Sequence, residues 1–289
     1  MSEVLITGGL GFVGAKLVAK LIDLGKNPLI LVRENQKDSA MSKFGGNVGV
    51  CTIDELSKIR DQNHIRTIVN LAGKYHFSPN HMELAEMVHA NIVLPRLIAE
   101  ELSQDLRKIK WIQASTFMQH VDSRPFFPSC FYAATKFAAE CDLQTFAQSG
   151  IDLTTLVLPH IYGEGDGRQK LLNYLIQQME NRQEIHVSSG TQVMDLVHVD
   201  DIVNAIILSM SSVLSGGRYQ VSSWNPLTIR DLIQYVFRAA NSQVPVKFDT
   251  SKDRLFEPRE IWSCAEALAG WNAKILVSEW INLYFQKRF

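Results

Sequence analysis

The stretch VLITGGLGFVG, residues Val4–Gly14, decides the fold of this 289-residue chain. Its first four residues, Val4–Thr7, are aliphatic or β-branched, which predicts a buried strand, and helical periodicity runs from Phe12 to Gly25. Glycines between a strand and a helix let backbone N–H groups approach a pyrophosphate, whose charge the helix N-terminus favours. The stretch therefore predicts a dinucleotide-binding α/β unit.

The glycines of this loop fit two spacings. Gly9-x-Gly11-x-x-Gly14 is the fingerprint of many two-domain dehydrogenases, whereas Gly8-x-x-Gly11-x-x-Gly14 is typical of a different group of nucleotide-binding enzymes. Both spacings place phosphates at the start of the helix, so the loop alone predicts only that a dinucleotide binds. A tight turn without a ligand is the alternative.

Short β-branched runs alternate with longer helical stretches through the first half of the chain. This alternation predicts an α/β fold with a Rossmann-type, doubly wound parallel sheet. After Pro159 the pattern becomes mixed, so we expect a dinucleotide-binding domain at 1–160 and a mainly substrate-binding α/β lobe at 161–289, with part of 191–212 returning to the first domain. Further strands are predicted at 28–32, 47–52, 66–72, 108–115 and 152–158, and helices at 82–103 and 132–148.

The composition argues against several classes of protein. A net charge of −1 gives no global attraction for nucleic acid or a membrane surface. No run approaches the roughly 20 apolar residues of a membrane span, and the N-terminus lacks the basic region of a signal peptide. The four cysteines show neither paired nor metal-ligand spacing, which is typical of a reducing compartment. We therefore expect a cytoplasmic protein without a metal site.

The end of the second predicted strand bears on the choice of cofactor. NAD-binding chains usually have an acidic residue there for the ribose 2′-hydroxyl, but the sequence LILVRENQ places Arg33 at this point. An arginine can pair with the 2′-phosphate of NADP, and Lys37 is a second candidate for that phosphate. A solvated surface arginine is the alternative. Because Glu34 follows directly, NAD stays open as the less favoured cofactor.

A tyrosine and a lysine share one face of a predicted helix. Tyr132 and Lys136 are four residues apart in CFYAATKFAAE, one strand after Ser115 and Thr116 in QASTF. Chance pairs of this spacing are common, but ligands bind at the carboxyl ends of the strands in open α/β sheets. A hydroxyl, a phenol and an ammonium group are therefore expected to meet beside the nicotinamide.

With these motifs the chain resembles the extended short-chain dehydrogenases/reductases of the nucleotide-sugar epimerase/dehydratase group. The resemblance covers nearly the whole chain, and in this family the glycines count as Gly8, Gly11 and Gly14. The last matching piece resembles the family's near-terminal helix. The pieces are TGGLGFVG, VNLAG, HANIVLPRLI, AST, YAATK, HIYGEGDG, MDLVHVDDIVNAI, RYQVSSWNPLTIRDLI and AEALAGW.

The resemblance implies roles for several residues. Tyr132 resembles the catalytic acid/base, and Lys136 resembles the residue that binds the nicotinamide ribose and lowers the tyrosine pKa by its charge. Thr116 lies at the position that hydrogen-bonds the reacting oxygen. Asn91 matches an asparagine that supports the site, with an amide bonded within its own helix as the alternative. The residues expected to bind the cofactor are Gly8, Gly11, Phe12, Val13, Gly14, Arg33, Leu71, Ala72, Gly73, Asn91, Tyr132, Lys136 and Pro159.

Within this family three reactions compete. A 4,6-dehydratase needs an acidic pair directly after Thr116, but Phe117 and Met118 stand there. A 4-epimerase keeps tightly bound NAD, whereas Arg33 favours NADP and hence a reductase that consumes NADPH. The short loop before Tyr132, with YHF and HIYGEGDGRQK, resembles the CDP-abequose synthase-like branch.

The resulting expectation is an NADPH-dependent oxidoreductase of deoxysugar or surface-polysaccharide biosynthesis, which reduces a 4-keto group on a CDP- or dTDP-linked deoxysugar. A nucleotide-sugar 4-epimerase is the main alternative. A reductase of a non-sugar carbonyl is another. An NADP-binding sensor is less favoured, because the Tyr132–Lys136 pair and Thr116 are all present.

A substrate pyrophosphate needs cations, and Arg168 and Arg254 are the leading candidates, although each could be a solvated surface charge. His160 is expected to line the sugar site or to cap the core. The family's usual arginines are replaced by Val157 and Met194, which leaves the phosphate contacts open. Arg218 and Arg259 are weaker candidates for phosphate ligands, and Asp195 matches the family's acid. Asp200 and Asp201 are expected to cap the helix that follows them. Phe126, Phe127 and Phe131 are expected either to form a wall of the sugar site or to pack in the core.

The resemblance also implies an assembly. Family members often dimerise through two long helices that form a four-helix bundle, which here would be 82–103 and 132–148. A homodimer is therefore expected, and a monomer in which these helices are covered is the alternative.

Overall fold

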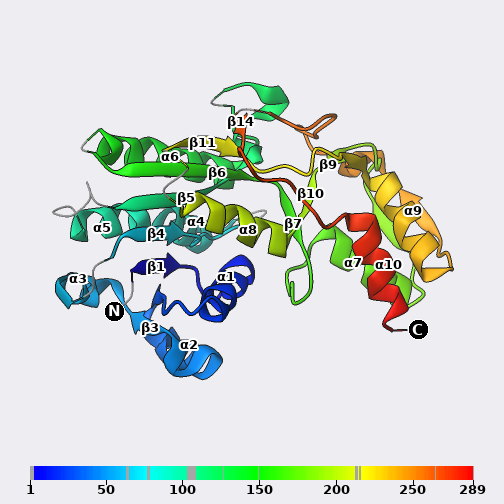
Figure 1. The fold of residues 1–289 in the computed structure, drawn as a ribbon. Coiled ribbons are helices and arrows are strands. Elements are labelled where there is room, and N and C mark those ends of the chain that lie inside the picture. The colour runs from blue at the N-terminus through cyan, green and yellow to red at the C-terminus, as the bar shows by residue number, and fades with distance from the viewer. Residues whose placement is uncertain are drawn as a thin grey trace.

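The structure is a computed structural model that describes residues 3–62, 65–76, 79–102, 109–125, 127–148, 150–211, 214, 216–263 and 265–288 (Figure 1). Its centre is an eight-stranded sheet in the order β14-β11-β6-β5-β4-β1-β2-β3, and each described pairing in it is parallel. The predicted α/β fold is confirmed. The strands are β1 Val4–Thr7, β2 Leu29–Leu31, β3 Gly49–Cys51, β4 Thr67–Asn70, β5 Lys110–Thr116, β6 Asp152–Leu158, β11 Gly217–Gln220 and β14 Glu266–Ala267.

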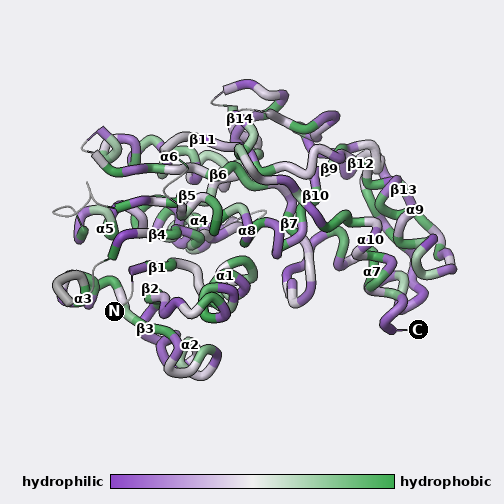
Figure 2. Tube along the Cα trace, in the orientation of Figure 1, coloured by the Kyte–Doolittle hydropathy of each residue, from purple (hydrophilic) through white to green (hydrophobic). Residues whose placement is uncertain are grey.

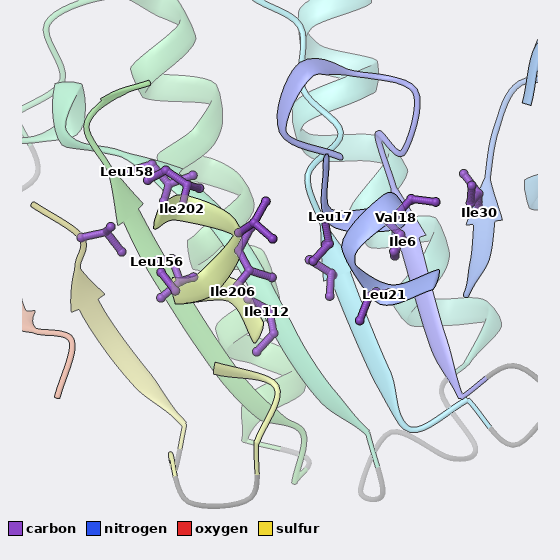
Figure 3. Close-up of a cluster of buried hydrophobic side chains, with 14 of the residues drawn as sticks. Ile6, Leu17, Val18, Leu21, Ile30, Ile112, Leu156, Leu158, Ile202 and Ile206 are labelled. Carbon is purple, nitrogen blue, oxygen red and sulfur yellow. The ribbon is translucent and has the colours of Figure 1, made fainter. Parts of the chain in front are cut away.

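Helices cover both faces of this sheet because neighbouring strand residues point to opposite sides. Ile6 packs with α1 and α8 on one face, as Figure 3 shows for the labelled side chains. Leu5 packs with α3, α5 and α6 on the other face. The helices are α1 Phe12–Asp23, α2 Lys37–Phe44, α3 Leu56–Gln62, α4 His81–Val88, α5 Leu94–Glu101, α6 Phe131–Ala147 and α8 Val199–Ser209.

The second lobe lies at one end of the sheet and has a core of its own, formed mainly by α7, α9 and α10 (Figure 1). In Figure 2 its helices carry both hydrophobic and hydrophilic residues, as expected of helices with one buried face. The elements are α7 Leu171–Glu180, α9 Ile229–Ala240, α10 Val277–Gln286, β7 His160–Tyr162, β8 Ile185–Val187, β9 Val193–Met194, β10 Leu196–His198, β12 Leu227–Thr228 and β13 Val246–Phe248.

Helix α8 comes late in the chain, yet its side chains Ile202 and Ile206 join the core that contains Ile6 and Leu17 of the first strand and helix (Figure 3). The segment therefore packs on the parallel sheet that contains β1. The division of the chain at residue 160 stays a prediction.

The prediction of a near-terminal helix in AEALAGW is wrong. This segment forms the edge strand β14, which pairs with β11, and then a turn in which Leu268 is buried. Trp271 Nε1 donates to the backbone oxygen of Asp201 at 3.0 Å. The open edge of the sheet supplies backbone partners to this short segment, and that pairing outweighs its local helical preference.

The helix predicted at 82–103 is interrupted. It consists of α4, a π-helical turn at His89–Val93, and α5, which ends at Glu101; residue 103 lies outside the described residues.

The expected capping of α8 by its aspartates is also wrong. The side chain of His198 caps the helix by accepting from the backbone N–H of Asp200. Asp201 Oδ2 instead accepts from the backbone N–H groups of Lys274 and Ile275, both at 2.9 Å. Within the described part of the chain, no helix is long and apolar enough to span a membrane.

Candidate active site

The glycine loop forms a cradle in which backbone approaches backbone. A Cβ on Gly8, whose φ is +69°, would lie 2.8 Å from the amide nitrogen of Ala72, and one on Gly14 would lie 2.1 Å from the carbonyl oxygen of Gly8. The amide of Gly11 donates to that same oxygen at 2.9 Å. A side chain at Gly8 or Gly14 would fill the cradle, and the N-terminus of α1 starts from Gly11, so the loop fits a dinucleotide pyrophosphate.

Gly9 has a different task. A Cβ on Gly9 would lie 2.6 Å from the Ile30 side chain on β2, so this glycine allows the loop to pack against the neighbouring strand. The structure thus supports counting Gly8, Gly11 and Gly14 as the phosphate-binding spacing.

A buried polar network fixes the loops at the carboxyl ends of β1, β4 and β5. Thr7 Oγ1 donates to Asn70 Oδ1 at 2.5 Å and accepts from the backbone N–H of Ala72 at 3.0 Å. Asn70 Nδ2 donates to Gln113 Oε1 at 2.8 Å. Sequence reasoning missed Thr7, Asn70 and Gln113; Thr7 and Asn70 end their strands, whereas Gln113 lies in the middle of β5.

Arg33 lies two residues after the end of β2 and is exposed, with its Nε donating to Gln36 Oε1 at 3.1 Å. Lys37 is less accessible to a ligand, because its Nζ contacts carboxylate oxygens of Glu34 at 3.0 Å and Glu55 at 2.8 Å. Of the two cations considered for a 2′-phosphate, the geometry therefore favours Arg33.

The residues expected to be catalytic lie on α6 and at the end of β5. Tyr132 and Lys136 lie on successive turns of α6, and Lys136 is only 3% exposed. An ideal Cβ on Gly73 would be 3.8 Å from Lys136 Nζ, so the ammonium lies beside the loop that follows β4. Thr116 ends β5, where its Oγ1 accepts from the Met118 amide at 3.4 Å.

Burial sets the proton affinities of this pair. It raises the pKa of Tyr132 to about 12, against the opposing charge of Arg168. It lowers the pKa of Lys136 to about 8, against the opposing charge of Glu140. The lowered tyrosine pKa expected from the sequence is wrong for this structure, because removal from water outweighs the nearby positive charge. The phenol stays protonated at neutral pH and is therefore suited to donate a proton.

Asn91 connects the loop after β4 to the catalytic helix. Its Nδ2 donates to the Lys74 carbonyl at 3.0 Å and to Thr135 Oγ1 at 2.9 Å, and its Oδ1 accepts from the Lys74 amide at 2.8 Å. The alternative of an amide bonded within its own helix is wrong. Asn91 lies in the π-helical turn, a feature that is frequent at functional sites.

A buried carboxylate anchors the catalytic helix to the sheet. Glu140, one turn beyond Lys136, accepts from Ser115 Oγ, from Gln119 Nε2 at 2.7 Å and from Arg218 Nε at 3.0 Å. The sequence analysis missed Glu140, although its spacing from Lys136 is a usable signal. Arg218 was considered a phosphate ligand, but its guanidinium is engaged inside this network.

Three cations, Arg168, Lys170 and Arg254, lie around Tyr132 and Tyr75. Arg168 is paired with Asp166 at 2.6 Å and stacks over the Phe12 ring at 4.7 Å, so it faces the glycine loop. Lys170 Nζ lies 4.9 Å from the centre of the Tyr75 ring. Burial and then the charges of Arg168 and Arg254 lower the pKa of Lys170. The sequence analysis missed Lys170, because a lone lysine in a loop carries no distinguishing pattern.

Tyr75 connects these cations to the catalytic tyrosine. Its ring meets that of Tyr132 edge-on at 5.2 Å. Burial raises the pKa of the Tyr75 phenol, and the charge of Arg254, together with a hydrogen bond from it, opposes that effect. Arg254 therefore lies beside Tyr75, and its role as a substrate ligand stays a prediction.

Comparison with known proteins agrees with this geometry. The model of the NAD dependent epimerase/dehydratase family matches residues 4–222. The chain belongs to this family.

Its relatives include two sugar-nucleotide enzymes. CDP-abequose synthase of Salmonella muenchen is 22% identical over 97% of this chain and 96% of its own length, and dTDP-4-dehydro-6-deoxyglucose reductase of Escherichia coli is 23% identical over 85% and 84%. Among solved structures, UDP-glucose 4-epimerase of Thermotoga maritima with UDP-glucose has a TM-score of 0.79, and MoeE5 with UDP-glucose and NAD has 0.81; both cover 99% of each chain at 20% and 19% identity.

These findings confirm the resemblance to the extended short-chain dehydrogenase/reductase type and to its CDP-abequose synthase-like members. The chain is an NAD(P)-dependent enzyme with a Rossmann-type fold.

The structure changes several of the interpretations made for candidate substrate-binding residues. Val157 is fully buried in the core and Met194 is nearly so, so neither position offers a charge to a phosphate. Asp195 accepts from Ser223 N at 2.9 Å and from Ser223 Oγ at 2.5 Å, so it has a structural role. Arg259 donates to Thr191 Oγ1.

The phenylalanines before the catalytic helix have different places. Phe127 packs edge-on against Phe256 at 5.4 Å, and Phe131 is 42% exposed at the start of α6. Phe126 lies outside the described residues. His160 follows β6 and its ring lies 4.8 Å from that of Phe117, next to Thr116.

Replacing Gly14 by alanine tests the cradle. We expect at least a 100-fold loss of dinucleotide affinity in G14A, because the new Cβ would occupy space 2.1 Å from the Gly8 oxygen. Cofactor titration by fluorescence measures the effect, with circular dichroism as the check on folding. G46A is the matched control, since nothing lies within 4 Å of a Cβ there. Wild-type affinity in G14A would contradict the cradle.

His160 predicts a pH dependence of stability. Burial, followed by the charges of Lys170 and Arg254, lowers its pKa from 6.5 to about 4. Between pH 6.5 and 4 the unfolded chain therefore binds more protons, so stability falls as the pH falls. From pH 7 to pH 5 we expect wild type to lose about 1–2 kcal/mol more unfolding free energy than H160Q. Urea denaturation at both pH values measures this, and parallel profiles would rule out a buried neutral imidazole.

Proposed function

We propose that this enzyme reduces a 4-keto group on a CDP- or dTDP-linked deoxysugar with NADPH. The observation that carries the proposal is the half-buried, protonated phenol of Tyr132, whose ring meets that of Tyr75 beside the cations Arg168 and Arg254. Relatives that span most of the chain support the substrate class, since they are CDP-abequose synthases and a dTDP-4-dehydro-6-deoxyglucose reductase.

The residues present suit each part of the cofactor. The loop from Gly8 to Gly14 would hold the pyrophosphate, and Arg33 the 2′-phosphate of NADP. Lys136 and Tyr132 would hold the nicotinamide ribose. When bound, the nicotinamide supplies the hydride that reduces the carbonyl carbon.

Tyr132 donates its proton to the carbonyl oxygen of the sugar as that oxygen becomes negative. Thr116 Oγ1 accepts from the Met118 amide, which leaves its own hydrogen free to be donated to the same oxygen. The positive charge of Lys136 stabilises the phenolate that forms. Glu140 supports that charge, because it opposes the effect of burial on the lysine pKa.

The crowded cations suit the diphosphate of a nucleotide sugar. Arg254 and Arg168 both lower the pKa of Lys170, so the three positive charges repel one another. A diphosphate placed among them would remove this repulsion and accept charge-assisted hydrogen bonds. Of the three, Lys170 and Arg254 surround Tyr75 and are the proposed substrate ligands, while Arg168 faces the glycine loop.

Dehydration is disfavoured at this site. The residue after Thr116 is Phe117, which packs against His160 and Trp262 at 4.8 and 5.8 Å and offers no acid for elimination of water. A 4-epimerase with tightly bound NAD is the second candidate, and solved epimerases with closely similar folds favour it.

An assay of cofactor use separates these candidates. With CDP- or dTDP-4-keto-6-deoxyglucose, we expect stoichiometric NADPH oxidation by wild type and a loss of at least 100-fold in kcat for Y132F, since proton donation by a positioned acid contributes about 10²–10⁴-fold. Absorbance at the nicotinamide band measures both. Redox-neutral isomerisation of a nucleotide sugar without net NADPH use would replace the reductase by the epimerase.

The cofactor proposal has its own variant. R33A is expected to raise the KM for NADPH at least about 10-fold and to leave the KM for NADH within about 3-fold, because hydrogen bonds to charged groups contribute about 1.5–3 kcal/mol. K43A, which removes an exposed cation from nearby α2, is the matched control. Equal changes for the two cofactors in R33A would show that Arg33 does not read the 2′-phosphate.

A further inference from the structure

A small cavity of about 20 Å³, which has room for about one water-sized group, lies beyond the carboxyl ends of β5, β6 and β11. The strand register pairs Thr116 with Leu158 and Val157 with Gln220, so the segments that follow these strands meet there. Phe117 follows Thr116 directly, and the pocket therefore adjoins the place of the reacting carbonyl. Its walls include Phe117, Pro159, His160, Gln220, Ile261 and Trp262.

Two buried nitrogen atoms belong to the side chains of this wall. His160 Nδ1 and Trp262 Nε1 are both inaccessible to solvent, and neither has a hydrogen-bond partner among the described residues. Trp262 is only 2% exposed as a whole. Both rings pack against Phe117, at 4.8 Å for His160 and 5.8 Å for Trp262.

Two other polar residues of the pocket, Asp195 and Gln220, differ from these two. Asp195 accepts two hydrogen bonds from Ser223, and Gln220 Nε2 donates to the backbone oxygen of Trp262 at 3.2 Å. Buried polar groups without a partner are costly and therefore rare in native proteins. The two nitrogen atoms thus point to a polar group of a ligand that completes the pocket.

The chemistry of the two nitrogen atoms defines that group. Indole Nε1 only donates, whereas Nδ1 of a neutral imidazole donates or accepts, depending on the tautomer. His160 is neutral at pH 7, because burial lowers its pKa to about 4. A hydroxyl group satisfies both partners with either tautomer, since its oxygen accepts from the indole and its hydrogen can be given to the imidazole.

We propose that Trp262 and His160 together recognise one hydroxyl group of the sugar ring, and that Trp262 is a specificity-determining residue. The identity of the ligand as a sugar rests on the proposed function. A substrate that lacks this hydroxyl leaves the indole N–H and the imidazole nitrogen unpaired, so the site discriminates against it.

Binding to the NADP⁺-loaded enzyme tests this inference, because NADP⁺ cannot supply a hydride. The probes are CDP- and dTDP-4-keto-6-deoxyglucose and the 2-deoxy and 3-deoxy analogues of each, titrated by calorimetry. For wild type we expect one of the two deoxy positions to weaken binding about 10-fold or more. In W262F we expect the parent sugar to lose about 10-fold, whereas the discriminated analogue keeps its wild-type affinity.

W271F is the matched control, since Trp271 Nε1 is already bonded to the Asp201 carbonyl outside the pocket. It is expected to preserve the discrimination. Equal binding of all analogues by wild type, or equal weakening of all of them by W262F, would overturn the proposal. The latter result would assign Trp262 to packing alone.

The two proposals fail in different ways. If binding discriminates between the analogues but no NADPH is consumed, the proposal of a hydroxyl-binding pocket stands and the proposal of a reductase is overturned. If NADPH is consumed but binding does not discriminate, the reductase stands and the hydroxyl-binding pocket is overturned. Absence of binding by both parent sugars overturns both.

Discussion

The site depends on one constraint, the contact of backbone with backbone in the glycine loop. Gly14 reaches the carbonyl of Gly8, and Gly8 reaches the chain at Leu71 and Ala72, so β1, α1 and the loop after β4 form one closely packed unit. The hydrogen bonds of Thr7 extend this unit to Asn70 on β4. Because the strands are parallel, the carboxyl ends of β5 and β6 lie at the same end of the sheet as those of β1 and β4. The proposed catalytic and substrate-binding groups are therefore positioned by this end of the sheet.

Burial then decides the direction of proton transfer. A dry environment favours the neutral form of each partner, and so it raises the pKa of Tyr132 and lowers that of Lys136. A phenol that holds its proton is matched to reduction of a carbonyl, in which the oxygen must gain a proton. With a pKa of about 8, Lys136 still carries its charge at neutral pH. Glu140 supports this charge and is itself held by Arg218, so a buried ion pair away from the substrate contributes to the state of the catalytic pair.

Local pattern was enough to predict most of the fold. Around the glycine loop, strands alternate with helices over short stretches of sequence. Each strand or helix could therefore be predicted from its own residues. The prediction failed at AEALAGW, where pairing with β11 at the sheet edge decides the structure. The prediction of Asp201 as a helix cap also failed, because its carboxylate accepts hydrogen bonds from backbone amides more than 70 residues away. Both errors concern partners that are distant in sequence.

The same distinction between local pattern and distant contacts applies to the residues of the candidate site. The spacing of Tyr132 and Lys136 could be read directly, because one helix face carries both. Lys170 could not, since its significance comes from Tyr75 and Arg254, which belong to other elements. Asn91 was named from the family resemblance, but its bonds to Lys74 and Thr135 appear only in the folded chain.

The substitutions at two positions explain why the cations of this site are arranged as they are. Val157 and Met194 stand where the family resemblance implies arginines, and both are buried in apolar cores. Under the proposed function, the positive charge for a diphosphate would come from other elements, and Lys170 and Arg254 offer it from the second lobe. Burial and then the charges of Arg168 and Arg254 lower the pKa of Lys170, so an anion placed among these cations would relieve their repulsion. Recognition of the diphosphate would thus involve residues that contact Tyr75, whose ring meets that of Tyr132.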